Sequence, residues 1–296
     1  MKGGGSLEHT HSRRSFLKFF LSAAAGMLFA LFFGYGYARY IEPKLMKVTQ
    51  ISMKNGKIPP AFDGLRLVQF SDTHLGHDYS IAQLVKVVSK INQLSPDIIL
   101  FTGDLVDKPN QYEYLHKIAP ELKKLKAPLG KYSIYGNHDH GGYGTDVYKA
   151  IMDESGFSLL KNSGKKISLL DGSFIYLAGI DDLMLGKPDY EQALAGADSS
   201  HFTLLLAHEP DAALETKKHP ADWQLSGHSH GGQVQLPLYG PLITPPFASV
   251  YTEGMYEEDG LTLYVNRGLG TTRLPFRFLS VPEITVFTLR TKEKST

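Results

Sequence analysis

Residues 223–234 read WQLSGHSHGGQV: an apolar stretch stops at a glycine, and two histidines follow, one residue apart. Four other apolar stretches end in a similar way, each with an Asp, Asn or His just after it. In chain order the polar residues at these five ends are Asp72 and His74; Asp104; Asn137, His138 and Asp139; His208; and His228 and His230. Because the carboxyl ends of strands form the ligand crevice of an α/β sheet, we expect these nine side chains to meet at one rim.

Two of these groups are pairs with a single residue between them, Asp72 with His74 and His228 with His230. In extended backbone, residues i and i+2 point to the same side, so we expect each pair to face one site. The neighbouring glycines allow the backbone to turn sharply there.

The nine side chains are three carboxylates, one amide and five imidazoles, and the chain has no cysteine. Disulfides and thiolate metal sites are therefore excluded. Imidazole with carboxylate suits Mn, Fe, Zn or Co, and there are too many ligands for one tetrahedral ion. Two divalent ions about 3.5–4 Å apart are the usual arrangement for displacement at phosphorus. The pattern predicts such a pair.

Each residue type also has an ordinary structural explanation. An Asp after a strand commonly caps a helix or turn, Gly-Asn-x-Asp is common in turns, and GHSHGG alone could be a flexible loop. A lone histidine such as His208 is most often structural. The metal-site interpretation is favoured because independent causes would not place matching residue types at five strand ends.

The rest of the body alternates short apolar segments, bounded by Gly, Pro, Asp or Asn, with amphipathic ones. Strands are predicted over 46–52, 65–71, 97–102, 131–135, 166–170, 173–180, 202–207, 222–226, 261–266 and 283–289. Helices are predicted over 81–94, with Ser80 as its cap, and over 111–125, 145–155, 190–195 and 212–217. The alternation predicts an α/β fold. Because the later part is rich in strands, we expect two mixed β-sheets packed together with helices outside, a four-layer α/β/β/α sandwich.

The first forty residues form a separate segment, and we assign residues 41–296 to the catalytic domain. Residues 12–20 read SRRSFLKFF, and residues 19–38 carry no charge, enough to span a bilayer. The stretch resembles a twin-arginine export signal, which implies the twin-arginine machinery as a partner. An ordinary membrane anchor is the alternative. Both place the body outside the cytoplasmic membrane, tethered or, after cleavage at the small residues near 36–38, released into the wall or medium.

Charge distribution argues against a nucleic-acid partner. The formal net charge is +1, but residues 1–40 contain five basic residues and one acid, so the body has 26 basic residues against 29 acidic ones. A slightly acidic body lacks the basic face that phosphate backbones require.

The five blocks, D-x-H, G-D, G-N-H-D, a lone His and G-H-x-H, resemble in order those of the calcineurin-like metallophosphoesterases. The resemblance covers about residues 63–290. Segments 236–247 and 266–289 resemble the exported or membrane-anchored bacterial branch of that family. Segment 237–247 is expected to be a rigid loop beside the site, although its apolar content could instead contact lipid.

The resemblance implies a role for each residue. The first metal is expected on Asp72, His74 and His230, the second on Asn137, His208 and His228, with Asp104 bridging both. Asn137 and His138 are expected to contact the substrate. His138, oriented by Asp139, is expected to donate a proton to the leaving oxygen while a hydroxide generated between the metals attacks phosphorus in line.

The sequence therefore predicts a hydrolase of phosphate mono- or diesters that uses two divalent ions, Mn, Fe or Zn. Its substrate is expected to be a phosphate ester, and the expected location makes esters linked to lipid or cell wall the candidates. One alternative is a non-catalytic metal-binding scaffold, against which the intact His138 argues. A dinuclear metallopeptidase or amidase is a further alternative, disfavoured because the five blocks contain no Glu base.

Overall fold

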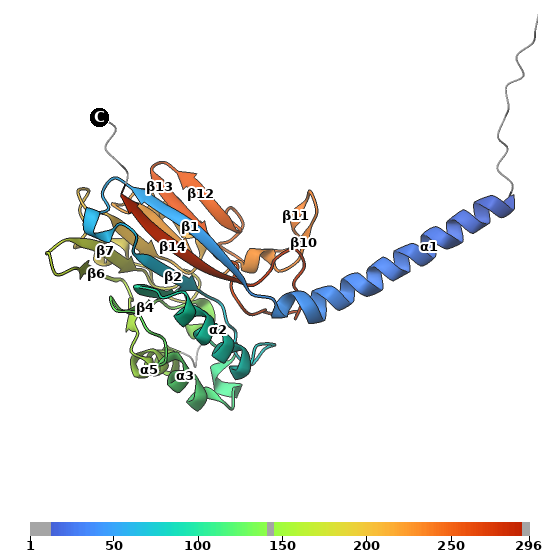
Figure 1. The fold of residues 1–296 in the computed structure, drawn as a ribbon, viewed down its shortest axis with the longest axis horizontal. Helices are drawn as coiled ribbons and strands as arrows, with labels where there is room; N and C mark the ends of the chain where they lie inside the picture. The colour runs from blue at the N-terminus through green and yellow to red at the C-terminus, as the bar shows by residue number, and fades with distance from the viewer. Residues whose placement is uncertain (1–12, 141–144, 292–296) are drawn as a thin grey trace, which may run out of the picture.

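The computed structural model describes residues 13–140 and 145–291, so the first twelve residues of the predicted export signal lie outside it. Two six-stranded sheets form the body (Figure 1). The first sheet has the order β1 (Lys47–Asn55), β14 (Glu283–Thr291), β2 (Arg66–Phe70), β3 (Ile98–Phe101), β4 (Lys131–Ser133) and β5 (Ser158–Leu159). The second has the order β12 (Gly254–Glu258), β13 (Leu261–Val265), β9 (Trp223–Ser226), β8 (Thr203–Leu206), β7 (Phe174–Gly179) and β6 (Ser163–Ser168).

Both sheets are mixed, and their central strands are parallel. In the first sheet β2, β3 and β4 run parallel, while β14 is antiparallel to β2. In the second sheet β7, β8, β9 and β13 run parallel, and β6 and β12 are antiparallel at the edges. Each parallel set brings several strand ends to one edge, which is where an α/β sheet builds a ligand site.

Apolar side chains from the two sheets pack against each other and form the central core, which includes Leu67, Leu100 and Phe287 on one side and Leu204 and Leu225 on the other. The outer face of the first sheet is covered by α2 (Ile81–Gln93), α3 (Ile118–Leu122) and α5 (Thr145–Ser155). The second sheet is covered in part by α6 (Tyr190–Ala193), with α7 (Ala213–Thr216) beside β13. The four-layer prediction is confirmed.

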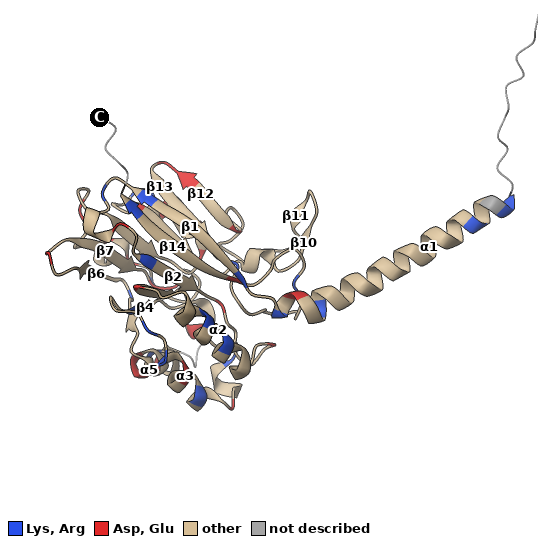
Figure 2. Ribbon diagram, in the orientation of Figure 1, with Lys and Arg blue, Asp and Glu red and all other residues tan. Residues whose placement is uncertain are grey.

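Helix α1 (Arg13–Gly36) projects from the body (Figure 1). It belongs to a segment, Phe16–Lys44, that is long and apolar enough to cross a membrane, and the most apolar 18-residue window of this segment has no buried residue in the structure. Lys and Arg lie at its two ends and not along its middle (Figure 2).

Residues on both sides of the boundary predicted at residue 40 pack on the body. After α1 come the π-helical turn η1 (Tyr37–Ile41) and the 3-10 turn η2 (Glu42–Lys44), and both pack on the body. The carbonyl of Ala38 accepts a hydrogen bond from the backbone N–H of Arg277 (2.9 Å), and the buried Glu42 carboxyl accepts from the N–H groups of Leu279 and Ser280. We call residues 35–44 the N-terminal junction.

Several local predictions were wrong. The helix predicted over 111–125 is a 3-10 turn at Leu115–Lys117 followed by the short α3. The segment 237–247, predicted as a loop, contains the turn of a short hairpin and its second strand, β11 (Gly240–Pro241), which pairs with β10 (Gln235–Leu236). Strand β12 was missed because its residues alternate between half-buried and exposed and carry little apolar signal.

Candidate metal centre

The nine predicted side chains lie at the carboxyl ends of β2, β3, β4, β8 and β9, and the structure brings them together between the two sheets. Seven of the nine are buried, and Asn137 and His138 are half-buried. Strand order explains the convergence, because β2, β3 and β4 are neighbours in one sheet and β8 and β9 are neighbours in the other. Most of the residues form two clusters, and a third group of possible ligands, His74, Asp104 and His138, overlaps both clusters.

The first cluster consists of Asp72, His74 and His230, whose ligand atoms lie within 4.8 Å of one another. The Nε2 atoms of His74 and His230 are 3.0 Å apart. Asp72 Oδ1 lies 3.5 Å from Nε2 of His230 and 4.0 Å from Nε2 of His74.

The second cluster consists of Asp104, His208 and His228, again within 4.8 Å. His208 Nε2 lies 3.3 Å from Asp104 Oδ2 and 3.2 Å from Nδ1 of His228. Asp104 Oδ2 is also 3.5 Å from Nε2 of His74 in the first cluster. Asp104 therefore lies between the two clusters, where the sequence predicts a bridging ligand.

Unsatisfied atoms show that these residues fit cations. The buried Oδ1 of Asn137 has no hydrogen-bond partner among the described residues. Leaving a buried carbonyl oxygen unpaired is unfavourable, and a cation would remove that cost. Two pairs of ring nitrogens also face one another, Nε2 of His74 with Nε2 of His230 at 3.0 Å and Nε2 of His208 with Nδ1 of His228 at 3.2 Å. In each pair at most one nitrogen can donate a hydrogen bond to the other. A ligand set of imidazole, carboxylate and amide suits Mn, Fe or Zn.

The backbone at the ligands is left-handed rather than extended, which corrects the expectation for the two pairs. Asp72, His74, Asp104, His228 and His230 have φ values between 43° and 66°. Non-glycine residues adopt this region uncommonly, and strain of this kind concentrates at functional sites. Each pair still faces one region, but it does so through tight turns after the strand end.

Glycines before the ligands permit close approach. A Cβ atom on Gly136 would overlap Oδ1 of Asp104, and one on Gly227 would overlap Oδ2 of Asp72. Gly136 therefore lies against the second cluster and Gly227 against the first.

The electrostatics of the site differ from group to group. Burial raises the pKa of Asp72, and the charge of Asp104 outweighs burial and raises the pKa of His208, whereas His228 and Asp104 shift toward the forms that bind metal. Burial, together with the charge of His208, lowers the pKa of His228 to about 3, so this imidazole is neutral. Burial would raise the pKa of Asp104, but the charges of His208 and His138 outweigh it and hold that pKa well below its usual value. Neutral imidazole and ionised carboxylate are the forms that coordinate cations.

The outer nitrogens of the rings are held by other groups. In the second cluster, Nδ1 of His208 lies 2.6 Å from the carbonyl of Thr102, and Nε2 of His228 lies 2.9 Å from the carbonyl of Pro246. In the first cluster, Nδ1 of His230 lies 3.2 Å from the guanidinium of the fully buried Arg277. Such contacts fix ring orientation around a metal.

Asp139 does not hold His138, contrary to expectation. Its carboxylate accepts hydrogen bonds from the backbone N–H groups of Asp104, Leu105 and Gly136, at 2.7–3.0 Å, and so shapes the turn that carries Asp104. The ring of His138 is held instead by Asp107, whose carbonyl oxygen lies 2.9 Å from Nδ1.

Asp107 was missed by sequence reasoning. Its Oδ1 also lies 3.5 Å from Nδ1 of His74, so one residue contacts both a cluster ring and His138. The available signal was a second Asp in GDLVD, three positions after Asp104.

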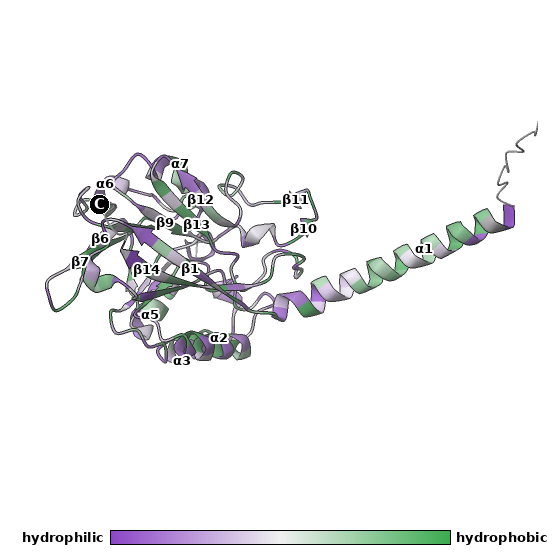
Figure 3. Cartoon of the chain, turned by 45° about the horizontal axis from the view of Figure 1, so that its top comes forward, coloured by the Kyte–Doolittle hydropathy of each residue, from purple (hydrophilic) through white to green (hydrophobic). Residues whose placement is uncertain are grey.

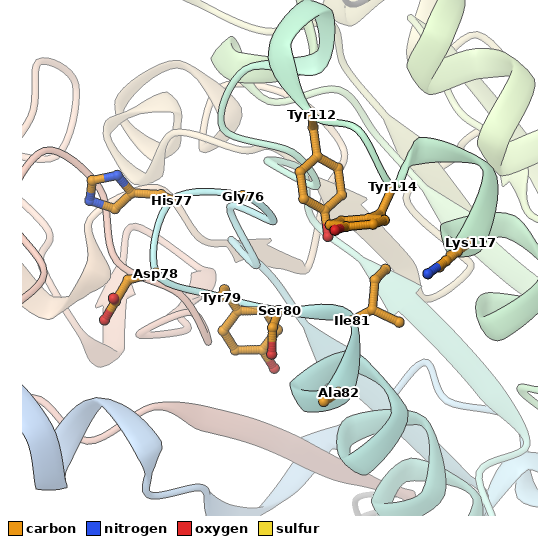
Figure 4. Close-up of a pocket in the computed structure, with 10 residues that line it drawn as sticks. All are labelled: Gly76, His77, Asp78, Tyr79, Ser80, Ile81, Ala82, Tyr112, Tyr114 and Lys117. Atoms are coloured by element: carbon orange, nitrogen blue, oxygen red, sulfur yellow. The ribbon is translucent and has the colours of Figure 1, made fainter.

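Two further histidines near the blocks lie outside the clusters. His140 Nε2 contacts Asp181 Oδ1 at 2.5 Å, so this pair forms a separate contact. His77 is half-buried and lines an adjacent pocket of about 440 Å³ (Figure 4). Tyr112 and Tyr114 form the opposite wall of that pocket, with their ring centroids 5.8 Å apart.

Comparison with known proteins agrees with this geometry. The sequence profile described as calcineurin-like phosphoesterase matches residues 65–232. The metallophosphoesterase YkuE of Bacillus subtilis (strain 168) is 54% identical over 94% of this chain and 98% of its own length.

Two more distant relatives have names that mention a membrane or a lipid. A transmembrane protein with a metallophosphoesterase domain from Danio rerio is 34% identical over 86% of this chain, which spans 60% of that longer protein. The UDP-2,3-diacylglucosamine pyrophosphatase LpxG of Chlamydia trachomatis is 30% identical over 84% of this chain and 90% of its own length. With the profile match over more than half its residues, the chain belongs to the calcineurin-like phosphoesterase family, enzymes that hydrolyse phosphoric esters.

Proposed function

We propose that this enzyme hydrolyses the phosphate ester or pyrophosphate bond of a lipid-linked substrate at the outer face of the cytoplasmic membrane. The observation that carries the proposal is the pair of Asp/His clusters, in which Asp104 of the second cluster lies 3.5 Å from His74 of the first. The relative LpxG, by its name, acts on a pyrophosphate that carries two acyl groups.

The first cluster would hold one divalent cation. The second cluster, joined by the unpaired Oδ1 of Asn137, would hold the other, with Asp104 common to both. When bound, such a pair activates water for attack and offsets charge that develops on phosphorus. Asn137 is neutral, so it would complete the site without repelling a phosphate.

His138 is placed to assist the leaving group. Its Nδ1 contacts the carbonyl of Asp107, which fixes the ring and leaves Nε2 for the substrate. Its ring lies edge-on to that of His74, with centroids 4.6 Å apart, at the half-exposed side of the site. In its protonated form, His138 would pass a proton to the departing ester oxygen.

The location rests on the N-terminal segment. Arg13, Arg14 and Lys18 precede the uncharged run of α1, which favours a cytoplasmic N-terminus and an exported body. The contacts of the N-terminal junction support a tethered enzyme, because they pack the end of the anchor on the catalytic body. Export through the twin-arginine machinery is part of this proposal.

The metallopeptidase alternative has less support. Glu209 directly follows His208, but its Oε2 accepts a hydrogen bond from the backbone N–H of Leu183. It therefore belongs to the contacts of a neighbouring loop, and it is not one of the cluster residues.

The test uses the full chain with added Mn²⁺ or Zn²⁺ and two soluble probes, 4-nitrophenyl phosphate and its bis-ester. We expect hydrolysis that a chelator removes and that His228→Ala abolishes. His201→Ala is the matched control, since its ring contacts the exposed Asp198 and His201 is not one of the cluster residues. Full activity of the His228→Ala variant would contradict the proposal.

A further inference from the structure

An apolar groove of about 230 Å³ begins at the first cluster. We define it by two walls, residues 242–245 and residues 272–276. Ser229 and His230 line its inner end, and His230 belongs to the first cluster. A ligand that filled this groove would therefore have one end beside the site where phosphate is expected.

The surface of the groove is mostly apolar, and large apolar side chains on both of its walls are open to solvent. Ile243 is 73% exposed and Leu274 is 62% exposed, and they stand on opposite walls. Apart from His230, the one ionisable side chain among the described lining residues is Arg273. Exposed apolar surface next to a polar catalytic site is unusual for a soluble enzyme and marks a binding surface.

The outer end of the groove meets the membrane segment. Phe276 of one wall contacts Tyr35 of α1, with ring centroids 5.4 Å apart. Tyr37 and Arg39 follow within four residues of Tyr35. Tyrosines and a basic residue at the end of an apolar helix are typical of the membrane–water interface. The groove therefore opens at the depth where a bilayer would end.

The hairpin of β10 and β11 extends the same apolar surface. Its turn exposes Leu238 and Tyr239, and it lies beside the base of α1 in both views (Figures 1 and 3). Val234, at the start of this hairpin, lines the groove and pairs with Phe278, which contacts Tyr37 of the N-terminal junction. Hairpin, groove wall and anchor thus form one continuous apolar surface.

The geometry points to this groove as the binding site for an acyl chain of the substrate, drawn from the bilayer in which α1 stands. The inference rests on the proposed function, because it assumes that a phosphate ester occupies the clusters. The acyl chain of the substrate would lie between Ile243 and Leu274, with the phosphate group beside His230. Each methylene moved from water to apolar surface contributes roughly a fourfold factor to affinity, so even a short buried section selects lipid over soluble esters.

The test places the full chain in phosphatidylcholine vesicles that contain phosphatidic acid with a photoactivatable acyl chain. After illumination, labelled peptides are mapped by mass spectrometry, and hydrolysis of 4-nitrophenyl phosphate is measured on the same preparation. We expect label on α1 and on both groove walls. Ile243→Arg should reduce labelling of the walls about tenfold or more and leave 4-nitrophenyl phosphate hydrolysis unchanged. Leu170→Arg, at an exposed turn between β6 and β7, is the matched control.

Label confined to α1 and to the hairpin turn at 237–239, or equal wall labelling in Ile243→Arg and the parent chain, would overturn the inference. Wall labelling without hydrolysis of either soluble probe would support the groove and count against the proposed function. Hydrolysis of 4-nitrophenyl phosphate without labelling of the walls would support the proposed function and overturn the groove inference. The walls are surface segments, and a thermal melt of each variant confirms that it folds.

Discussion

The two clusters of the metal centre are built from similar residues but are supported differently. In the second cluster, the outer ring nitrogens contact backbone carbonyls of Thr102 and Pro246. In the first cluster, they face the side chains of Arg277 and Asp107. Thr102 directly follows β3 and Pro246 lies in the loop between β11 and β12, so the second cluster is supported by main chain, whereas the first is supported by side chains from other packed segments.

The supports of the first cluster lead back to the N-terminal junction. The guanidinium of Arg277 also contacts the carbonyls of Gly270 and Ser280, and its backbone N–H donates to Ala38. Ser280 Oγ donates to the carbonyl of His230, and its N–H donates to Glu42. The first cluster is therefore connected to the N-terminal junction through two contacts, at Ala38 and Glu42. We infer that substitutions near the anchor affect the first cluster and spare the second.

The largest effect is expected from Asp104→Asn, which removes the carboxylate common to both clusters. We expect activity to fall on the order of 10³-fold or more, because stabilisation of charge at phosphorus is lost. Metal analysis should show loss of more than one ion per chain. Asp198→Asn, at an exposed turn, is the control. Retention of both ions would mean that Asp104 does not bridge them.

Gly136→Ala and Gly227→Ala separate the clusters. The first substitution places a methyl group against Asp104 and the second against Asp72, and overpacking of this kind costs about 1–3 kcal/mol. Because Asp104 is common to both clusters, we expect Gly136→Ala to weaken both ions, and Gly227→Ala to weaken mainly the ion of the first cluster, as measured by metal titration. The same loss pattern in both variants would contradict the separation.

Arg277→Lys tests side-chain support. Lysine keeps the charge but cannot reproduce the planar fork, so His230 should lose its fixed orientation. We expect the affinity of the first cluster for its ion to fall about 10–100-fold, with the second cluster unchanged. Because Arg277 is fully buried, circular dichroism must first show a native fold. Unchanged affinity at both sites would show that Arg277 is purely structural.

The smallest effect is expected from Glu42→Gln in the N-terminal junction. Both Glu42 oxygens accept backbone N–H bonds, and an amide can replace only one of them, so we expect a loss of about 1–3 kcal/mol in the free energy of unfolding. A denaturant titration measures it. Glu121→Gln, whose carboxyl contacts the surface residue Lys124, is the control and should change stability less.

The sequence predicted the four layers and the convergence at the strand ends because both follow from local apolar patterning and from the fixed direction of parallel strands. It did not predict the left-handed backbone of Asp72 or His228, since the surrounding turns impose that conformation through tertiary contacts. The partners of His138 and Glu42 are likewise separated in sequence by 31 residues and by more than 230 residues. No local pattern can identify such pairs.

The junction also bears on the fate of the leader. Gly36 and Ala38 offer the small-x-small pattern that a signal peptidase recognises, yet Ala38 is buried and its carbonyl accepts a hydrogen bond from the body. A peptidase must draw its substrate into an extended strand, and a protein exported already folded would present this segment as packed helix. We therefore expect the mature enzyme to keep its leader and to work at a fixed height above the bilayer, reaching only molecules that diffuse in the plane beneath it.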